Sequence, residues 1–306
     1  MASDAEAASE GAAVDDRAED DWTAAEDVRP GAGGPETVLV TGCSSGIGRA
    51  TALAFREQGW RVYATAREEG DVEELTEYGC LTDELDVTED RNVRRVVKRV
   101  ATEAGRVDCL VNNAGYGQLG PIEEVPIRDV RKQFDVHVFG PYQLIQQVLP
   151  HMRERGRGSI VNVSSVLGRV AAPGTGVYSG SKFALEAMSD SLRAEVSEFG
   201  IDVVVVEPAL VDTSFNERAA RELDERETTT EYGWIEELFE DIRAVGEGGP
   251  FSVPPARVAA AVVNAASATQ PAPRYPVGGA ASLLLKARYL PDPWRDLLYR
   301  MVRRMA

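Results

Sequence analysis

Tyr178 and Lys182 stand four residues apart in the segment VYSGSK, among residues that are otherwise small. Positions four apart lie on one face of a helix, so the phenol and the ammonium converge if this segment is helical. A phenol has a pKa of about 10 and is a poor base at pH 7, whereas a cation about 4 Å away supplies about 4 kcal/mol toward its ionisation at an effective dielectric near 20. The spacing therefore predicts a proton-transfer pair; a surface tyrosine beside a solvated lysine is the alternative.

A glycine pattern, TGCSSGIG, overlaps the end of the apolar run TVLVT and leads into a helical period. In that context Gly42 permits a tight turn, Gly46 lets the backbone approach a pyrophosphate, and Gly48 lets helix and strand pack closely. The start of the helix would then direct unpaired amides at the anion. We therefore expect a dinucleotide to bind at Gly42, Ser44, Ser45, Gly46, Ile47 and Gly48.

The residues after the second apolar run, RVYAT, select between the two nicotinamide dinucleotides. A carboxylate about 20 residues beyond the glycines holds the adenosine ribose of NAD and repels a 2′-phosphate. Here Ala66 and Arg67 occupy this region, and a guanidinium grips a phosphate at two points. The pattern favours NADP(H) over NAD; the alternative is that Arg67 points into solvent.

Short β-branched runs alternate with longer amphipathic segments from residue 36 onward. Runs that are apolar on both faces are typical of buried parallel strands, and the alternation indicates right-handed βαβ units. The predicted fold class is α/β, with one doubly wound parallel sheet of about seven strands, helices on both faces and a helical lid insertion. One such helix is expected over 89–105. The strands are expected at 37–41, 61–65, 108–113, 159–163 and 202–207, with a weaker one ending over 84–88 and a late one at 274–278.

Composition divides the chain into segments. Residues 1–35 are rich in Asp, Glu and Ala, and we expect a disordered acidic tail there. Residues 36–280 form the dinucleotide-binding domain. Within it, the charged and strandless stretch over 213–255 is expected to be a lid, because its aromatic residues must cover apolar surface; a solvated helix pair is the alternative.

Residues 281–306 are apolar and basic in an otherwise acidic chain. One interpretation is an interfacial helix on an anionic membrane. The other is that Leu297, Leu298 and Met301 pack on the subunit or at a dimer interface, with arginines at the rim. The second interpretation is favoured, so a membrane partner is not expected.

The net charge of −17 argues against nucleic acid as a partner, because phosphate contacts need clustered positive charge. Three widely spaced cysteines and two histidines give little support to disulfides or to a metal site. The chain has no uncharged run of membrane-spanning length and no basic, apolar signal sequence, so a cytoplasmic location is expected. The acidic composition suits a high-salt cytoplasm.

Four ordered motifs, TGCSSGIG, NNAG, NVSS and YSGSK, resemble those of the short-chain dehydrogenase/reductase family. The likeness spans residue 37 to about residue 278 and looks most like the 17β-hydroxysteroid dehydrogenase branch. It implies a Rossmann-type, NADP(H)-dependent oxidoreductase that transfers a hydride between nicotinamide and the carbonyl or secondary alcohol carbon of a mostly apolar small molecule. It also implies a homo-oligomer, a dimer or a tetramer.

The resemblance assigns roles to the motif residues. Tyr178 would be the general acid or base. Lys182, with the positive nicotinamide of the oxidised cofactor, would lower the pKa of Tyr178, and it would also hold the nicotinamide ribose. Ser165 would steady the substrate oxygen, with Ser164 as the competing choice. The NNAG turn would support the sheet and line the cofactor site. The remaining cofactor contacts implied are Asp86, Val87, Asn113, Ala114, Gly115, Pro208, Val211 and Thr213, together with Tyr178 and Lys182.

His137 departs from the family pattern, which has Asn as a fourth catalytic residue. In the family the main-chain carbonyl of that residue positions a water in a proton relay, and a main-chain contact survives a change of side chain. A sharper hypothesis is that the imidazole itself joins the relay and adds a titration near its ordinary pKa of about 6.5. The same substitution favours a rival function, a catalytically weak NADPH-binding protein that signals redox state.

Overall fold

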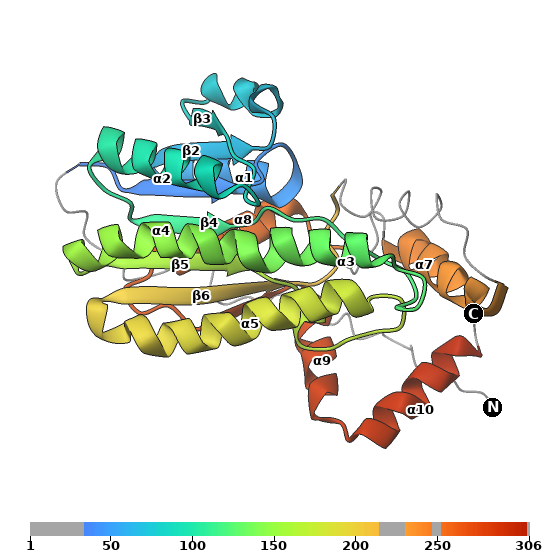
Figure 1. Ribbon diagram of the computed structural model, residues 1–306. Helices are drawn as coiled ribbons and strands as arrows, with labels where there is room; N and C mark the ends of the chain where they lie inside the picture. Colours follow the sequence, from blue (N-terminus) through green and yellow to red (C-terminus); the bar gives the residue numbers. More distant parts are fainter. Residues whose placement is uncertain (1–33, 214–229, 247–251, 305–306) are drawn as a thin grey trace, which may run out of the picture.

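A single parallel sheet organises the residues that the computed structural model describes, which are 34–213, 230–246 and 252–304 (Figure 1). Seven strands lie in the order β3, β2, β1, β4, β5, β6, β7, and every adjacent pair is parallel. The predicted doubly wound sheet is confirmed. The strands are β1 (Thr37–Thr41), β2 (Arg61–Ala66), β3 (Leu81–Glu84), β4 (Cys109–Asn112), β5 (Gly158–Val163), β6 (Ile201–Pro208) and β7 (Arg274–Val277).

Helices cover both faces of the sheet (Figure 1). Helices α1 and α8 pack together on one face, and α2, α4 and α5 lie on the other. The helices are α1 (Gly46–Glu57), α2 (Asp90–Ala104), α3 (Ile127–Phe134), α4 (Gly140–Arg155), α5 (Gly176–Val196), α7 (Gly233–Gly246), α8 (Pro255–Ser267), α9 (Gly279–Lys286) and α10 (Asp292–Arg303). Short 3₁₀ or π segments are η1 (Glu69–Asp71), η2 (Glu73–Thr76), η3 (Asp135–Phe139), η4 (Val166–Gly168), η5 (Ser197–Phe199), η6 (Thr230–Tyr232) and η7 (Ala287–Tyr289).

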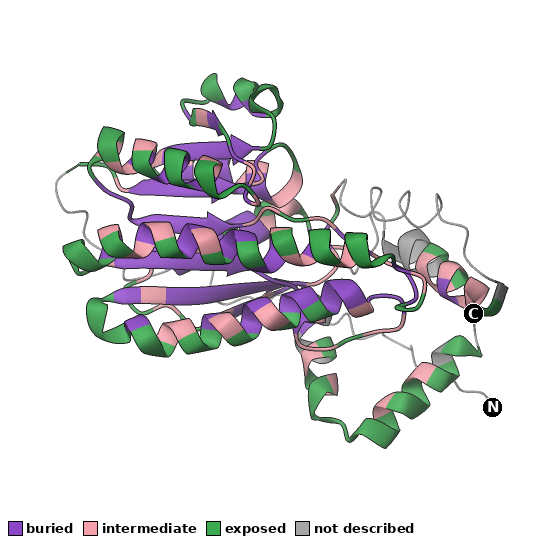
Figure 2. Cartoon of the chain, in the orientation of Figure 1, coloured by how far each residue is buried: buried purple, intermediate pink, exposed green. Residues whose placement is uncertain are grey.

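Successive strand residues enter different cores. Val38 and Val40 of β1 belong to the core beneath α1 and α8, whereas Leu39 belongs to the core beneath α2 and α4. All three are fully buried, and Figure 2 shows the strands buried along most of their length. A strand covered on both faces must be apolar at every position, which explains the continuous apolar runs.

The direction of strand addition reverses between β1 and β4. The chain first adds β2 and β3 on one side of β1, and then returns to place β4 on the other side. In open α/β sheets, ligands bind outside the carboxyl ends of the strands at such a point. The glycine turn that follows β1 and the NNAG segment that follows β4 therefore meet at one edge.

The helix expected over 89–105 is confirmed as α2. Gly105 follows it with a φ of 68°, a left-handed conformation that favours glycine at the end of a helix. The apolar side chains of α2 face the sheet. The buried residues are Val93, Val96, Val97 and Val100.

The weaker strand was expected too late in the chain. Strand β3 ends at Glu84, and the segment over 86–88 is a turn. The Asp86 carboxylate accepts hydrogen bonds from the Thr88 amide at 2.9 Å and the Thr88 hydroxyl at 2.7 Å. This local side-chain bonding competes with a strand ladder, which is why the β-branched residues there do not extend β3.

The acidic tail and part of the lid lie outside the described residues. The expected tail contributes only residues 34 and 35 to them, and the expected lid contributes residue 213, η6, α7 and the segment over 252–255. Helix α7 packs on the loop before α5, because a Cβ built on Gly174 would lie 2.6 Å from the side chains of Ile235 and Phe239. Its role as a lid stays a prediction.

The C-terminal extension forms α9 and α10. Leu297, Leu298 and Met301 are 48%, 47% and 52% exposed, so the subunit leaves about half of each side chain uncovered, and the dimer-interface alternative stays a prediction. The reason is the orientation of α10, whose Tyr299 hydroxyl instead donates to the Ala171 carbonyl. No helix among the described ranges combines the length and apolarity needed to cross a membrane.

Candidate active site

The carboxyl ends of β5 and β6 meet the first turns of α5 at the predicted site. Ser165 lies just beyond β5, and Pro208 ends β6. Tyr178 and Lys182 are both buried in α5, 7% and 6% exposed. The Lys182 ammonium donates to the Val163 carbonyl at the end of β5 over 2.9 Å. The structure therefore brings Ser165, Tyr178 and Lys182 into one cluster.

The glycine turn leaves no space for side chains. Gly42 has a φ of 71°, and a Cβ on it would lie 2.8 Å from the Ala114 Cα. A Cβ on Gly48 would lie 2.1 Å from the Gly42 carbonyl oxygen. Gly46 has a φ of 54°, and its Cβ would lie 3.0 Å from the Thr213 side chain. The turn is thus compressed between the segments after β4 and β6.

The start of α1 fits the pyrophosphate of a dinucleotide. Ser44 and Ser45 are exposed, and Ile47 packs on the core behind them. The Ser45 side chain does not cap the first amides of α1, and the first turn carries no acidic residue. Amides at a helix start with no carboxylate nearby attract an anion.

Asn113 and Thr41 fasten the ends of β1 and β4 to each other. The Asn113 side-chain amide donates to the carbonyls of Thr41, at 2.9 Å, and Gly42, at 3.1 Å. The Thr41 hydroxyl in turn accepts from the amides of Asn113 and Ala114, each at 3.0 Å. This network fixes the glycine turn relative to the NNAG segment.

The predicted cofactor-selecting residues lie on the same edge of the sheet. The Cys43 amide donates to the Thr65 carbonyl at 2.8 Å, which ties the glycine turn to the end of β2. Arg67 follows β2 and is exposed, while Asp86 is half-buried after β3. Val87 is buried against the start of α4.

The segment after β6 closes this edge from the other side. The Ser165 hydroxyl lies 3.4 Å from the Pro208 carbonyl, to which it donates. Val211 forms a parallel bridge with Val253, and Thr213 lies against the glycine turn. The segments that follow β1, β4, β5 and β6, which carry most of the predicted cofactor residues, thereby meet at one edge of the sheet.

Tyr178 is hydrogen-bonded to Ser165 through their side chains. Burial raises the pKa of Tyr178 to about 12, and the bond to Ser165 opposes that rise. Ser165 is also held by the Leu167 amide, which donates to its hydroxyl at 3.1 Å. Ser164 is buried beside it, but a Cβ on Gly168 would lie 2.6 Å from the Ser164 hydroxyl, so Ser164 points toward η4.

Lys182 lies 5.8 Å from the centre of the Tyr178 ring. Burial lowers the pKa of Lys182 to about 8, and the charge of Glu186 opposes that effect. The sequence predicted that this cation, together with the positive charge of an oxidised nicotinamide, would bring the pKa of Tyr178 toward neutrality. In the protein without a cofactor, burial is the largest influence on both groups, and the prediction for the cofactor-bound enzyme stays a prediction.

His137 connects the NNAG segment to α5. Its Nε2 accepts from the Tyr116 amide at 3.1 Å and lies 3.0 Å from the Gln133 side-chain nitrogen. Its Nδ1 lies 3.0 Å from the Ser181 hydroxyl. A backbone amide only donates, so the proton of the neutral ring sits on Nδ1 and is donated to Ser181. The Ser181 hydroxyl donates onward to the Tyr178 carbonyl at 2.7 Å.

The environment of His137 keeps its imidazole neutral. Burial, assisted by the charge of Lys182, holds the pKa of His137 well below 6.5. The hypothesis that the imidazole adds a titration near pH 6.5 is therefore wrong. The π-helical segment η3 contains His137, and Pro141 has no N–H to offer the His137 carbonyl four residues earlier.

A buried ionic cluster lies behind Lys182. The Glu186 carboxylate contacts Arg274 at 3.1 Å, and Glu207 contacts Arg169 at 3.0 Å and Arg274 at 3.3 Å. Burial, with the charge of Glu207, raises the pKa of Glu186 to about 7. These ion pairs place two carboxylates and two guanidinium groups beneath Ser165, Tyr178 and Lys182.

Sequence reasoning missed three buried polar residues of this site. Glu186 had a usable signal, because it stands four residues after Lys182 and so on the same face of α5. Gln133 had the same kind of signal, because it stands four residues before His137, which it contacts at 3.0 Å. The contact of Ser181 with His137 had none, since the two residues are 44 positions apart.

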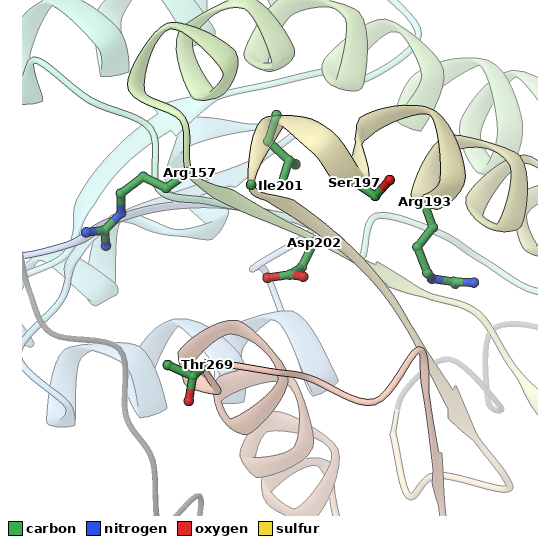
Figure 3. A pocket seen from close by; sticks show the side chains of 7 residues that line it. Arg157, Arg193, Ser197, Ile201, Asp202 and Thr269 are labelled. Atoms are coloured by element: carbon green, nitrogen blue, oxygen red, sulfur yellow. The ribbon is translucent and has the colours of Figure 1, made fainter.

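A pocket at the opposite end of β5 and β6 is remote from this cluster (Figure 3). Arg193 in its wall donates to the Val203 carbonyl and to Asp190, both at 2.7 Å, and so holds the end of α5 against β6. The lining residues are Arg157, Arg193, Ser197, Gly200, Ile201, Asp202 and Thr269. This set contains none of the predicted site residues.

We predict that Gly115→Ala destabilises the protein by about 1–3 kcal/mol, because the added Cβ would lie 2.7 Å from the His137 Nε2. Gly180→Ala is the matched control, since its Cβ meets nothing closer than 3.8 Å and gains helix propensity of up to about 1 kcal/mol. Urea unfolding measures both. Equal free energies of unfolding for the two variants would refute the close contact.

A second prediction concerns the pH dependence of stability without cofactor. The pKa of Lys182 is about 8 in the fold against 10.5 when solvated, so between these values the unfolded chain binds the extra proton and stability rises with pH. Between pH 8 and pH 10.5, the free energy of unfolding of wild type should rise by up to about 3 kcal/mol more than that of Lys182→Met. Lys98→Met, at an exposed lysine, should follow wild type. The claim fails if the two variants show the same pH dependence.

Comparison with known proteins agrees with this geometry. A family model described as short chain dehydrogenase matches residues 36–224. A 3-ketodihydrosphingosine reductase of Bacteroides thetaiotaomicron is 34% identical over 84% of this chain and 94% of its own length. An NADPH-dependent 3-dehydrocapnine reductase of Ornithobacterium rhinotracheale is 33% identical over 85% and 95%.

A solved structure extends the likeness to three dimensions. The short-chain dehydrogenase from Streptomyces avermitilis superposes with a TM-score of 0.72 at 35% identity, covering 87% of this chain and 95% of that one. Proteins of this family bind nicotinamide cofactors and act on small molecules. The chain belongs to the short-chain dehydrogenase/reductase family and is an oxidoreductase.

Proposed function

We propose that this enzyme is an NADP(H)-dependent reductase or dehydrogenase of mostly apolar ketones and secondary alcohols, with Tyr178 as the general acid or base. The observation that carries the proposal is the buried hydrogen bond between Tyr178 and Ser165, with Lys182 one helical turn away. Two neighbouring hydroxyls can both reach one substrate oxygen. The 17β-hydroxysteroid dehydrogenase branch remains part of the proposal.

In the reductive direction Tyr178 donates its proton to the substrate oxygen while Ser165 holds that oxygen. NADPH, when bound, supplies the hydride. A phenol whose pKa is raised by burial is fully protonated at neutral pH, which suits this direction. A water held by the His137 carbonyl would pass a proton to Lys182, which would return a proton to Tyr178, and the His137 side chain acts as a positioning group.

The residues on the cofactor edge suit NADPH. The amides at the start of α1 would hold the pyrophosphate, with Ser44 and Ser45 beside it. Arg67 would hold the 2′-phosphate and Asp86 would lie at the adenine. The NADPH dependence in the name of the Ornithobacterium relative supports this choice.

Apolar side chains surround the loop that leads into Tyr178. A Cβ on Gly176 would lie 2.5 Å from Ile122, and Gly174 packs against Ile235 and Phe239 of α7. We therefore propose that α7, within the lid over 213–255, contributes to substrate binding. The keto substrate in the name of the Bacteroides relative fits this chemistry.

The remaining parts of the proposal are a homo-oligomer, a dimer or tetramer, and a cytoplasmic location. The rival redox-sensing function finds no support among the described residues, because Ser165, Tyr178 and Lys182 are all in place. The membership of an oxidoreductase family argues in the same direction.

We expect Tyr178→Phe to reduce ketone-dependent NADPH oxidation about 10²- to 10⁴-fold, because the proton donor is lost. NADPH binding, followed by fluorescence titration, should persist. Tyr142→Phe, at an exposed tyrosine of α4, should leave both unchanged. A Tyr178→Phe enzyme with wild-type turnover would contradict the assignment.

Arg67→Asp should reverse the cofactor preference. Losing a charge-assisted hydrogen bond to the 2′-phosphate lowers the ratio of kcat/KM for NADPH over NADH by about 10- to 100-fold. Arg128→Asp, at an exposed arginine of α3, is the charge-matched control. A ratio that does not move would remove Arg67 from the cofactor site.

A further inference from the structure

Helix α10 has a continuous apolar face that points away from the protein. Trp294, Leu297, Leu298 and Met301 have the i, i+3, i+4, i+7 spacing of one helix face. Trp294 is 64% exposed, and the other three are about half exposed. We define these four residues as the α10 stripe.

The polar face of α10 is the one that contacts the subunit. The Tyr299 hydroxyl donates to the Ala171 carbonyl, and the Arg303 guanidinium lies 5.4 Å from the centre of the Trp234 ring. At 100° per residue, Tyr299 and Arg303 project away from the stripe. Figures 1 and 2 show α9 and α10 as a V that stands off the body, with α10 largely exposed. The polar face of α10 thus contacts the protein and its apolar face is exposed, the reverse of the usual arrangement. An exposed apolar face of this kind marks an interaction site.

The V carries more apolar surface and a charge opposite to that of the whole chain. Leu284, Tyr289 and Leu290 are 45%, 80% and 37% exposed. The segment over 284–304 has six basic residues and two acidic ones, whereas the chain as a whole has a net charge of −17. The basic residues are Lys286, Arg288, Arg295, Arg300, Arg303 and Arg304.

We propose that α9 and α10 dock on an anionic lipid surface, with the α10 stripe inserted among the acyl chains. Arg295, which also pairs with Asp292, and Arg304, which directly follows α10, lie on opposite flanks of the stripe, at the level where headgroup phosphates would be. Trp294 supplies an apolar body with a polar N–H, which suits a membrane interface. This departs from the interpretation that the sequence favoured, packing on the subunit or at a dimer interface, and it does not depend on the proposed cofactor or substrate.

A second copy of the chain is a weaker occupant for this surface. In a two-fold interface the same surface of both subunits is in contact. A two-fold contact between α10 helices would therefore place the arginines of one copy near the arginines of the other, and these like charges repel. Anionic headgroups have the complementary charge instead. Docking would also bring the substrate side to the lipid, since α10 touches α7 and the loop before Tyr178.

The test is co-sedimentation of the full chain with phosphatidylglycerol vesicles and with phosphatidylcholine vesicles. We expect binding to phosphatidylglycerol, much weaker binding to phosphatidylcholine, and a partial loss as KCl is raised because salt screens only the electrostatic part. The double variant Leu297→Ser, Leu298→Ser should bind phosphatidylglycerol at least about 10-fold more weakly, given the apolar area removed. It should keep the melting temperature of wild type.

Phe199→Ser is the matched control, because Phe199 is 41% exposed on η5, away from α10. It should bind the vesicles like wild type. The proposal is overturned if wild type does not bind phosphatidylglycerol, if it binds phosphatidylcholine equally, or if the double variant binds like wild type. It is also overturned if sedimentation velocity shows that the double variant dissociates an oligomer, because a second copy would then cover the stripe.

Discussion

Burial of an acid and a base in the same cluster is the constraint on which the site depends. Removal from water raises the pKa of Tyr178 to about 12 and lowers that of Lys182 to about 8. Returning the phenol pKa to neutrality takes about 7 kcal/mol, whereas one cation at about 6 Å supplies about 3 kcal/mol at an effective dielectric near 20. Lys182 alone does not supply that energy, so the proposed role of Tyr178 as a base also requires the positive charge of an oxidised nicotinamide.

Hydrogen bonds and ion pairs from the rest of the site hold that cluster in place. Asn113 locks the glycine turn to β4, and His137 links the NNAG segment to α5 by bonds at both ring nitrogens. A neutral imidazole fully engaged in this way acts as a structural bridge, and it leaves the main chain of η3 for any relay. Glu186 and Glu207 form ion pairs with arginines beneath Lys182. The negative charge of Glu186 partly offsets the cost of burying the Lys182 ammonium.

Sequence patterns predicted the parts of the structure that depend on local composition. The β-branched runs gave six of the seven strands close to their observed bounds, and the order of the motifs predicted the cluster of Ser165, Tyr178 and Lys182. Strand β3 was displaced because the Asp86 side chain bonds locally, which composition does not reveal. The tautomer of His137 and the orientation of α10 depend on contacts between distant segments, so neither had a sequence signal.

The central claim is that a bound oxidised cofactor makes Tyr178 acidic. NMR of protein labelled with ¹³C at the tyrosine Cζ tests it directly, because this carbon reports phenol ionisation and Tyr178→Phe identifies the resonance. With NADP⁺ the Tyr178 resonance should titrate below about pH 10, and without NADP⁺ it should stay that of a neutral phenol throughout the same range. A Tyr178 resonance that titrates identically with and without NADP⁺ would contradict the account.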